Sequence, residues 1–184
     1  MRIGNMWYTN VVLRTLVEMI PTPSFFLNIP KMDKIVCHIG VGSGTEKRSH
    51  VLRPMVLLTL LSGQKAIPCL SKKAVAGFHL RENTPIGAKV TLRKSRMDDF
   101  FSTFLFVVLP GLRDFHGISY KAVDKVGNLT VGLQDVSVFP SLAPYTETMK
   151  GKTGIQITFC CNAKDQEKGI LFWKTMGVPF IDSK

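Results

Sequence analysis

The clearest alternation of apolar and polar side chains lies between Gly87 and Arg93. One face of this segment carries Ala88, Val90 and Leu92, and the opposite face carries Lys89, Thr91 and Arg93. A period of two residues is typical of a half-buried strand. The segment is therefore predicted to be a strand with one core face and one cationic, hydrogen-bonding face.

The same period predicts further strands on both sides of this segment. Between Asp33 and His38, the side chains of Ile35 and Cys37 alternate with those of Lys34, Val36 and His38. Residues 155–161 alternate in the same way, with Ile155, Ile157, Phe159 and Cys161 on one face and Gln156, Thr158 and Cys160 on the other. The range 123–139 is predicted to form two strands around a turn at Gly127-Asn128.

Helical spacing and cap residues predict helices in the remaining stretches. The first is an amphipathic helix whose predicted apolar face contains Trp7, Val11, Leu16 and Ile20. It is predicted to stop at Pro21 and Pro23. A second helix is predicted to begin near Arg53 with Pro54 at its first position, in preference to a longer helix kinked at Pro54. It ends at Ser62 to Gln64, and the basic stretch that follows to Thr84 is loosely patterned.

Two more helices complete the chain. Ser95 is predicted to cap a central helix whose apolar run reaches Leu109, and its phenylalanines, Phe100, Phe101, Phe104 and Phe106, are predicted to pack in the core. Asp165 is predicted to cap a closing helix that ends before Gly177. The order of elements predicts an α+β fold, a single domain with a mainly antiparallel sheet and helices packed on one face. No apolar run is long enough for a membrane span.

The positive charge is concentrated in a short part of the chain. The whole sequence has 24 Lys plus Arg against 13 Asp plus Glu, a formal net charge of +11. Eleven of these basic residues and one acid, Glu82, lie between Lys47 and Met97. Solubility alone favours interspersed signs, so this block indicates a polyanionic partner, and a phosphate backbone fits it better than a membrane surface. A basic face kept for solubility is the alternative.

Motifs for catalysis or cofactor binding are incomplete. The glycine cluster Gly40 to Gly44 follows a predicted strand, but its spacing fails the dinucleotide fingerprint, and no acid that could hold a ribose occurs between Glu46 and Glu82. No nucleophile elbow or paired-histidine motif occurs, and the four cysteines lack zinc-site spacing. We therefore expect no enzyme activity, no metal and no cofactor; a nucleotide-binding enzyme using Gly40 to Gly44 is the rival hypothesis, and a free RNA chaperone is a third.

A set of short motifs, in order, resembles a known family. They are Ile29 to Ile35, Gly40-Val41-Gly42, Ser62 to Lys65, Ala76-Gly77-Phe78, Pro85 to Arg93, Arg113 to Gly117, Gly127-Asn128, Phe139-Pro140, Ala163-Lys164 and Gly177 to Phe180. Over residues 28–180 the chain resembles the universal large-subunit ribosomal protein five family, the 5S-rRNA-binding protein of the central protuberance. Residues 1–27 are then an N-terminal helix and a proline-rich connection to this single ribosomal RNA-binding domain.

The resemblance implies a role in RNA binding without catalysis. It implies that a sheet surface and adjoining helix ends hold 5S rRNA, and the expected RNA-binding residues are His38, Gln64, Lys65, Lys89, Thr91, Arg93, Lys94 and Arg96. The family usually has Asn at the position of His38, which alters that contact because a neutral imidazole donates or accepts differently from an amide.

Two further contacts are implied by the resemblance. The loop from Ser71 to Thr84 would face the peptidyl-site tRNA through Lys72, Lys73, His79 and Arg81. The segment around Arg113, Asp114 and His116 would reach the small-subunit head in an intersubunit bridge, and neighbouring central-protuberance proteins are further expected partners. Gly111 and His116 stand where the family usually has arginines, which weakens those contacts.

The same departures, with twelve Phe and four Cys, favour an organellar ribosome. We expect the mitochondrial matrix, with a plastid or a bacterial cytoplasm as alternatives. An acid-free stretch from Met1 to Val17 fits the remnant of a presequence as well as it fits a first helix. Because some mitochondrial ribosomes lack 5S rRNA, large-subunit rRNA is the alternative RNA partner.

Overall fold

The structure is a computed structural model that describes residues 30–41, 51–78, 80–113, 115–146 and 153–181. The predicted first helix and the glycines after Val41 lie outside these residues. The chain divides into two compact units. We call the residues of 1–35, 93–131 and 158–184 unit 1, and those of 36–92 and 132–157 unit 2.

Five strands form one sheet, in the order β2-β3-β1-β5-β4. Their bounds are Met32–Gly40 for β1, Ile67–Leu70 for β2, Pro85–Leu92 for β3, Leu129–Leu133 for β4 and Ile155–Cys161 for β5. Strands β2 and β3 are antiparallel, with Ile67 opposite Lys89. Three strands, β1, β4 and β5, contribute residues to both units.

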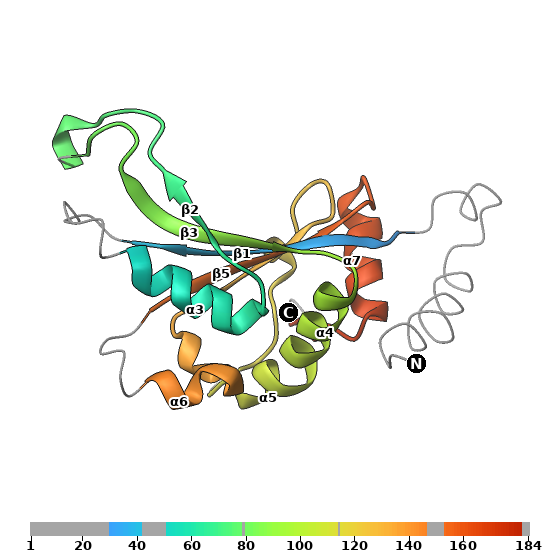
Figure 1. Cartoon of the computed structure of the whole chain (residues 1–184). Helices are drawn as coiled ribbons and strands as arrows, with labels where there is room; N and C mark the ends of the chain where they lie inside the picture. Colours follow the sequence, from blue (N-terminus) through green and yellow to red (C-terminus); the bar gives the residue numbers. More distant parts are fainter. Residues whose placement is uncertain (1–29, 42–50, 79, 114, 147–152, 182–184) are drawn as a thin grey trace. The chain divides into compact units, whose positions relative to one another are not determined.

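Helical segments lie between successive strands, and α7 follows the last strand (Figure 1). The α-helices are α3 at Leu52–Ser62, α4 at Ser95–Thr103, α5 at Leu109–Gly111, α6 at Ala143–Thr146 and α7 at Gln166–Thr175. A π-helical turn, η5 at Phe104–Val108, joins α4 to α5, and single 3₁₀ turns are η4 at Ala76–Phe78, η6 at Tyr120–Ala122, η7 at Val136–Val138 and η8 at Pro140–Leu142. The predicted α+β class with an antiparallel sheet is confirmed.

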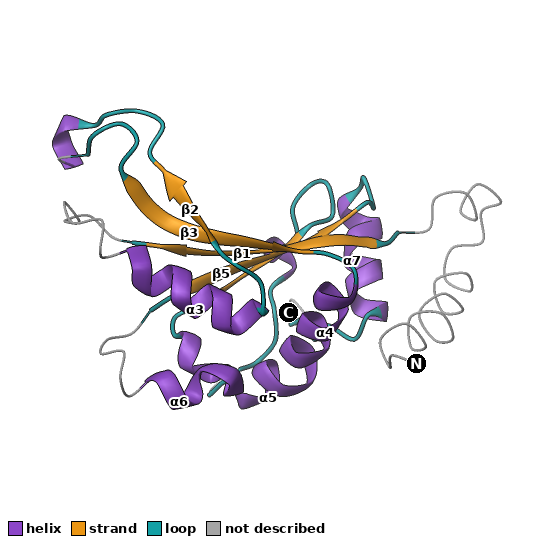
Figure 2. Ribbon diagram, viewed as in Figure 1, coloured by secondary structure: helices purple, strands orange, loops and turns teal. Residues whose placement is uncertain are grey.

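In unit 2, helix α3 packs against strand β3 (Figure 2). The strand places Ala88, Val90 and Leu92 in the core, each at most 1% exposed. Helix α3 contributes Leu57 and Leu58 to this core and ends at Gly63, whose φ of 62° lies in the left-handed region that favours glycine. The helix begins at Leu52, so Pro54 is its third residue and not its first as predicted; it still lies in the first turn, where its missing N–H removes no helix hydrogen bond.

In unit 1, an aromatic cluster joins the helical run 95–111 to β5 and α7. The ring of Phe159 lies 5.0 Å from that of Phe104 and 6.0 Å from that of Trp173, measured between centroids. The indole N–H of Trp173 donates to the carbonyl of Gly127 at 2.8 Å. The strand therefore buries the face that its alternation predicted, and the helices of this unit pack on that face.

One strand was not predicted, and one strand prediction was wrong. Strand β2 lies in the stretch that the sequence analysis described as loosely patterned. It was missed because its side chains are mostly exposed and show no alternation of buried and exposed positions. The range 123–139 contains one strand, β4, preceded by a tight loop in which Asp124 accepts hydrogen bonds from the backbone N–H groups of Val126 and Asn128. Residues after Gln134 form a 3₁₀ turn, capped by the Asp135 side chain, in place of a second strand.

Three details of the helices also differ from expectation. Lys94, not Ser95, occupies the N-cap of α4, and its backbone has a φ of 54°. Phe106 is 65% exposed and is not part of the core. Asp165 does stand at the N-cap of α7, but its side chain makes no capping hydrogen bond. Among the described residues, no helix has the length and apolar content needed to cross a bilayer.

Candidate nucleic-acid interface

The face of β3 opposite the core is polar and accessible. Lys89 is exposed and Thr91 is half-buried on this face, while α3 covers the other side. Strand β2 lies next to it and adds Ile67, which is 60% exposed and opposite Lys89. We call the surface formed in unit 2 by His38, Gln64, Lys65, Ile67, Lys89 and Thr91 the open face.

Gln64 and Thr91 are brought together by a hydrogen bond. The Gln64 side-chain amide donates from Nε2 to the carbonyl of Thr91 at 3.1 Å. Gln64 comes directly after the helix cap Gly63, so the end of α3 is tied to strand β3 at this point. The bond leaves the Gln64 Oε1 atom available as an acceptor, and the Thr91 hydroxyl has no hydrogen-bond partner among the described residues.

His38 lies over a close approach between β1 and β3. A side chain at Gly87 would come within 2.7 Å of the Ile39 carbonyl and 3.2 Å of the His38 Nε2 atom. The backbone N–H of Val41 donates to the carbonyl of Ile86 at 2.9 Å, which holds the two strand ends together. Gly87 therefore leaves room for the imidazole, and His38 is half-buried at the edge of the open face.

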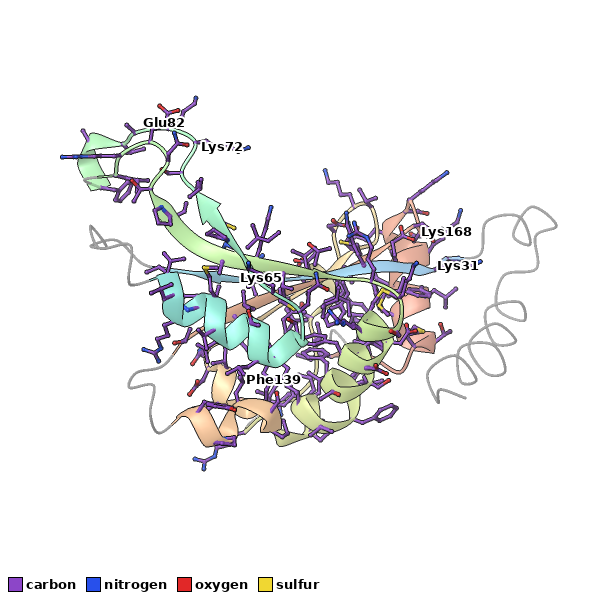
Figure 3. All side chains as sticks on the ribbon, viewed as in Figure 1. Lys31, Lys65, Lys72, Glu82, Phe139 and Lys168 are labelled. Carbon is purple, nitrogen blue, oxygen red and sulfur yellow. The ribbon has the colours of Figure 1, made fainter. Side chains whose placement is uncertain are left out.

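The loop between β2 and β3 has a closed neck. Ser71 is 4% exposed; its hydroxyl donates to the Arg81 carbonyl at 2.6 Å and accepts from the Thr84 N–H at 3.0 Å. Backbone bonds join Ser71 to Thr84 and Asn83 as well. Beyond this neck Lys72, Lys73 and Arg81 are exposed, and Figure 3 places Lys72 and Glu82 on the loop. His79 lies outside the described residues.

The tip of the same loop carries a feature that was not predicted. Phe78 is 68% exposed. The sequence does carry a signal for Phe78, namely an aromatic residue between basic positions in a loop. Aromatic and cationic side chains together are typical of surfaces that bind nucleic acids.

The other predicted RNA-binding residues lie in unit 1. Arg93, Lys94 and Arg96 are found at the start of α4, where Arg93 and Lys94 are exposed. Asp98 adds an acidic charge in the first turn of this helix. Lys94 adopts its positive φ while its carbonyl accepts from the N–H groups of Met97 and Asp98.

The predicted bridge segment is accessible where it is described. His116 is exposed, Arg113 is part of the described chain at the end of the helical run, and Asp114 lies outside the described residues. Ile118 pairs with Phe180, whose ring stacks on that of Tyr120 at 5.1 Å between centroids. These contacts fix the end of the bridge segment to the C-terminal part of unit 1.

The described residues contain no group of three or more His, Cys, Asp or Glu side chains able to hold a metal ion. Burial raises the pKa of the Cys160 thiol, although the nearby Lys34 ammonium acts in the opposite direction. The thiol is therefore more fully protonated near neutral pH than an ordinary cysteine, so it is a poor metal ligand and nucleophile.

Comparison with known proteins gives consistent matches over most of the chain. Residues 26–81 match the family model of ribosomal protein L5, and residues 85–180 match the model for the C-terminus of the same ribosomal family. The chain is 40% identical over 174 residues to large ribosomal subunit protein uL5 of Fusobacterium nucleatum, covering 95% of this chain and 93% of the relative. The uL5 proteins of Lactococcus lactis and Streptococcus thermophilus are 40% and 38% identical over 173 residues, each covering 94% of both chains.

Proposed function

This chain belongs to the ribosomal protein L5 family, and from that premise we propose that its open face binds ribosomal RNA in the central protuberance. The chain is a structural, non-catalytic constituent of the large ribosomal subunit. Family membership supports neither the nucleotide-binding enzyme nor the free RNA chaperone. The RNA is 5S rRNA where the ribosome contains it, and large-subunit rRNA otherwise.

The observation that carries the proposal is the division of strand β3 into two faces. Its apolar side chains are buried under α3, while Lys89 and Thr91 lie on the side that no described helix of unit 2 covers. Lys89 supplies attraction to phosphates that does not depend on sequence. The Thr91 hydroxyl and the tethered Gln64 amide supply hydrogen bonds that fix position.

Binding to 5S rRNA tests this proposal through its salt dependence. Lys89→Ala and Arg93→Ala should each weaken binding and lower the slope of log K against log salt by about one unit per lost phosphate contact. Lys168→Ala, an exposed change on α7, is the matched control and should leave the slope unchanged. Unchanged slopes for both the Lys89 and the Arg93 variants would contradict RNA binding by the open face and by the start of α4.

Thr91→Val separates hydrogen bonding from charge in the same assay. It preserves the shape of the side chain and removes the hydroxyl, so affinity should fall by about 1 kcal/mol with no change in the salt slope. An affinity equal to that of the wild type would mean that the hydroxyl does not contact RNA.

Further contacts are proposed for the two accessible segments. The loop from Ser71 to Thr84 faces the peptidyl-site tRNA, and the segment around Arg113 and His116 contacts the small-subunit head. Both proposals come from the family resemblance and are supported by the exposure of Lys72, Lys73 and His116. Crosslinking from Lys72 and from Arg113 in assembled ribosomes would identify each partner.

The compartment is a separate proposal. The named relatives are bacterial, so they fit a bacterial cytoplasm and do not support the mitochondrial location that the sequence predicted. We propose the mitochondrial matrix from the sequence departures at Gly111 and His116 together with the twelve Phe and four Cys. Cell fractionation tests it: the chain should be recovered with mitochondrial ribosomes, and recovery with cytoplasmic ribosomes would overturn it.

A further inference from the structure

We propose that the ring of Phe78 stacks on an exposed nucleobase of the peptidyl-site tRNA. The inference rests on the proposed function, because it takes the partner of this loop to be the peptidyl-site tRNA. It goes beyond that function by assigning a stacking contact to Phe78, which is not among the basic residues expected to face the tRNA.

The first observation is the exposure of the ring. Phe78 is 68% exposed, more than any other large apolar side chain among the described residues. An exposed ring of this size is unfavourable in water, since burying it would remove a large apolar area from solvent. Its position therefore indicates a partner surface.

The second observation is that backbone hydrogen bonds join the described residues of the tip. Val75 and Leu80 form a two-bond bridge, with N–H to carbonyl distances of 2.9 Å and 3.1 Å. The N–H of Phe78 also donates to the Val75 carbonyl at 3.2 Å, within the turn η4 at Ala76–Phe78. A ring on a braced turn loses little further conformational entropy when it binds, which favours a defined contact.

The charge of the loop favours RNA over an apolar protein pocket. Between the neck and the tip lie the exposed cations of Lys72, Lys73 and Arg81, with Glu82 as the only described acid of the loop. Aromatic rings on cationic surfaces stack on nucleobases, while the cations contact the backbone. A hydrophobic protein partner would gain nothing from the surrounding lysines.

The test is tRNA binding to the peptidyl site of programmed ribosomes reconstituted with full-length variants. Phe78→Leu retains an apolar side chain without a planar ring, Phe78→Ala removes it, and Phe78→Tyr keeps the ring. We expect Leu and Ala to raise the dissociation constant of full-length deacylated tRNA at least about fivefold, and Tyr to change it less than about twofold. The family resemblance implies that the loop faces the elbow of the tRNA. An anticodon stem-loop lacks the elbow, so it should bind equally to all four ribosomes.

Three outcomes would overturn the inference. If ribosomes with Phe78→Leu and with Phe78→Ala both bind tRNA with wild-type affinity, Phe78 does not contact the tRNA. Retained affinity for Leu with loss for Ala indicates an aliphatic pocket in a protein. Equal losses for the anticodon stem-loop indicate a general assembly defect.

A charge variant distinguishes failure of this inference from failure of the proposed function. If Lys72→Ala with Lys73→Ala weakens tRNA binding while the Phe78 variants do not, the loop contacts tRNA without stacking. If neither set has an effect, the proposed tRNA contact fails as well.

Discussion

Cys37 lies at the centre of strand β1, with its thiol in the core of unit 2. It is 0% exposed, and burial raises its pKa to about 12. A thiol with this pKa stays protonated at pH 8, and the thiolate is the form that reacts with alkylating reagents.

We therefore expect Cys37 to resist alkylation in the native protein. Iodoacetamide at pH 8, followed by peptide mass spectrometry, should modify the half-buried Cys69 well before Cys37, and both should react after unfolding in urea. Equal rates for the two cysteines in the native protein would show that the core around β1 opens readily.

Asp124 stabilises the loop before β4 through its ionised carboxylate. Desolvation is the largest single effect on its pKa and opposes ionisation, but hydrogen bonds from Asn128, Val126 and Gly127 together hold the pKa of Asp124 below its ordinary value of 3.8. A group whose pKa is lowered by folding contributes stability above its unfolded pKa, and the contribution is lost as pH falls through the folded value.

Asp124→Asn should therefore lower the free energy of unfolding at pH 7, by at most about 1 kcal/mol because solvent screens this exposed loop. The difference from wild type should shrink as pH falls below about 4. Urea unfolding at pH 7, 4 and 3 measures it. A difference independent of pH would mean that the negative charge contributes nothing.

At the scale of elements, helix α7 depends on a close backbone contact with the loop before β4. A Cβ atom at Gly169 would clash with the Gly127 Cα, and Gly127 itself has a φ of 95°. The same Gly127 carbonyl accepts from the Trp173 indole at 2.8 Å and from the Cys161 thiol at 3.0 Å. The helix thus approaches the loop only because both residues lack a Cβ.

Gly169→Ala should destabilise unit 1 despite the better helix propensity of alanine. Overpacking costs about 1–3 kcal/mol, which exceeds the gain of about 1 kcal/mol for Ala over Gly in a helix. Gly111→Ala is the control, since no atom beyond its chain neighbours and its own helix backbone lies within 4 Å of the added methyl group. Equal stability of the two variants, by thermal unfolding, would contradict the close contact.

The elements that were predicted correctly are those whose burial follows their own sequence. Strands β1, β3 and β5 alternate because one face of each is buried. Strand β2 has no such face, with Ile67 and Leu70 60% and 51% exposed, so it exists only through pairing with β3. No local pattern carries that information.

The helical run after Ser95 illustrates a second limit. Its buried side chains recur as pairs every four residues, Phe100 and Phe101, Phe104 and Leu105, Val108 and Leu109. A spacing of four exceeds the 3.6 of an α-helix and accompanies the π-helical turn. Because Phe106 and Val107 are apolar too, composition alone could not separate the buried from the exposed positions.

The cationic character of the candidate site was predictable, whereas its internal geometry was not. Alternation alone placed Lys89 and Thr91 on one face. The bond from Gln64 to the Thr91 carbonyl and the neck at Ser71 join residues 27 and 13 positions apart. Such non-local hydrogen bonds leave no periodic mark in a sequence.

At the scale of the whole molecule, the net charge of +11 predicts how the chain associates with its subunit. In sucrose gradients at low salt it should sediment with the large subunit. Rising salt should release it, because counterions compete for the phosphates. Recovery at the top of the gradient at low salt would contradict a structural role in the subunit.

The sheet ends at β2, and the second residue of that strand is Pro68. A proline has no amide hydrogen to offer an incoming chain, and a four-residue edge presents few other groups. Newly translated copies that have not yet met their RNA thus have little opportunity to join strand to strand at this edge. Pro68 would protect a pool of unassembled protein from aggregation, a hazard that arises before the protein reaches the particle in which it works.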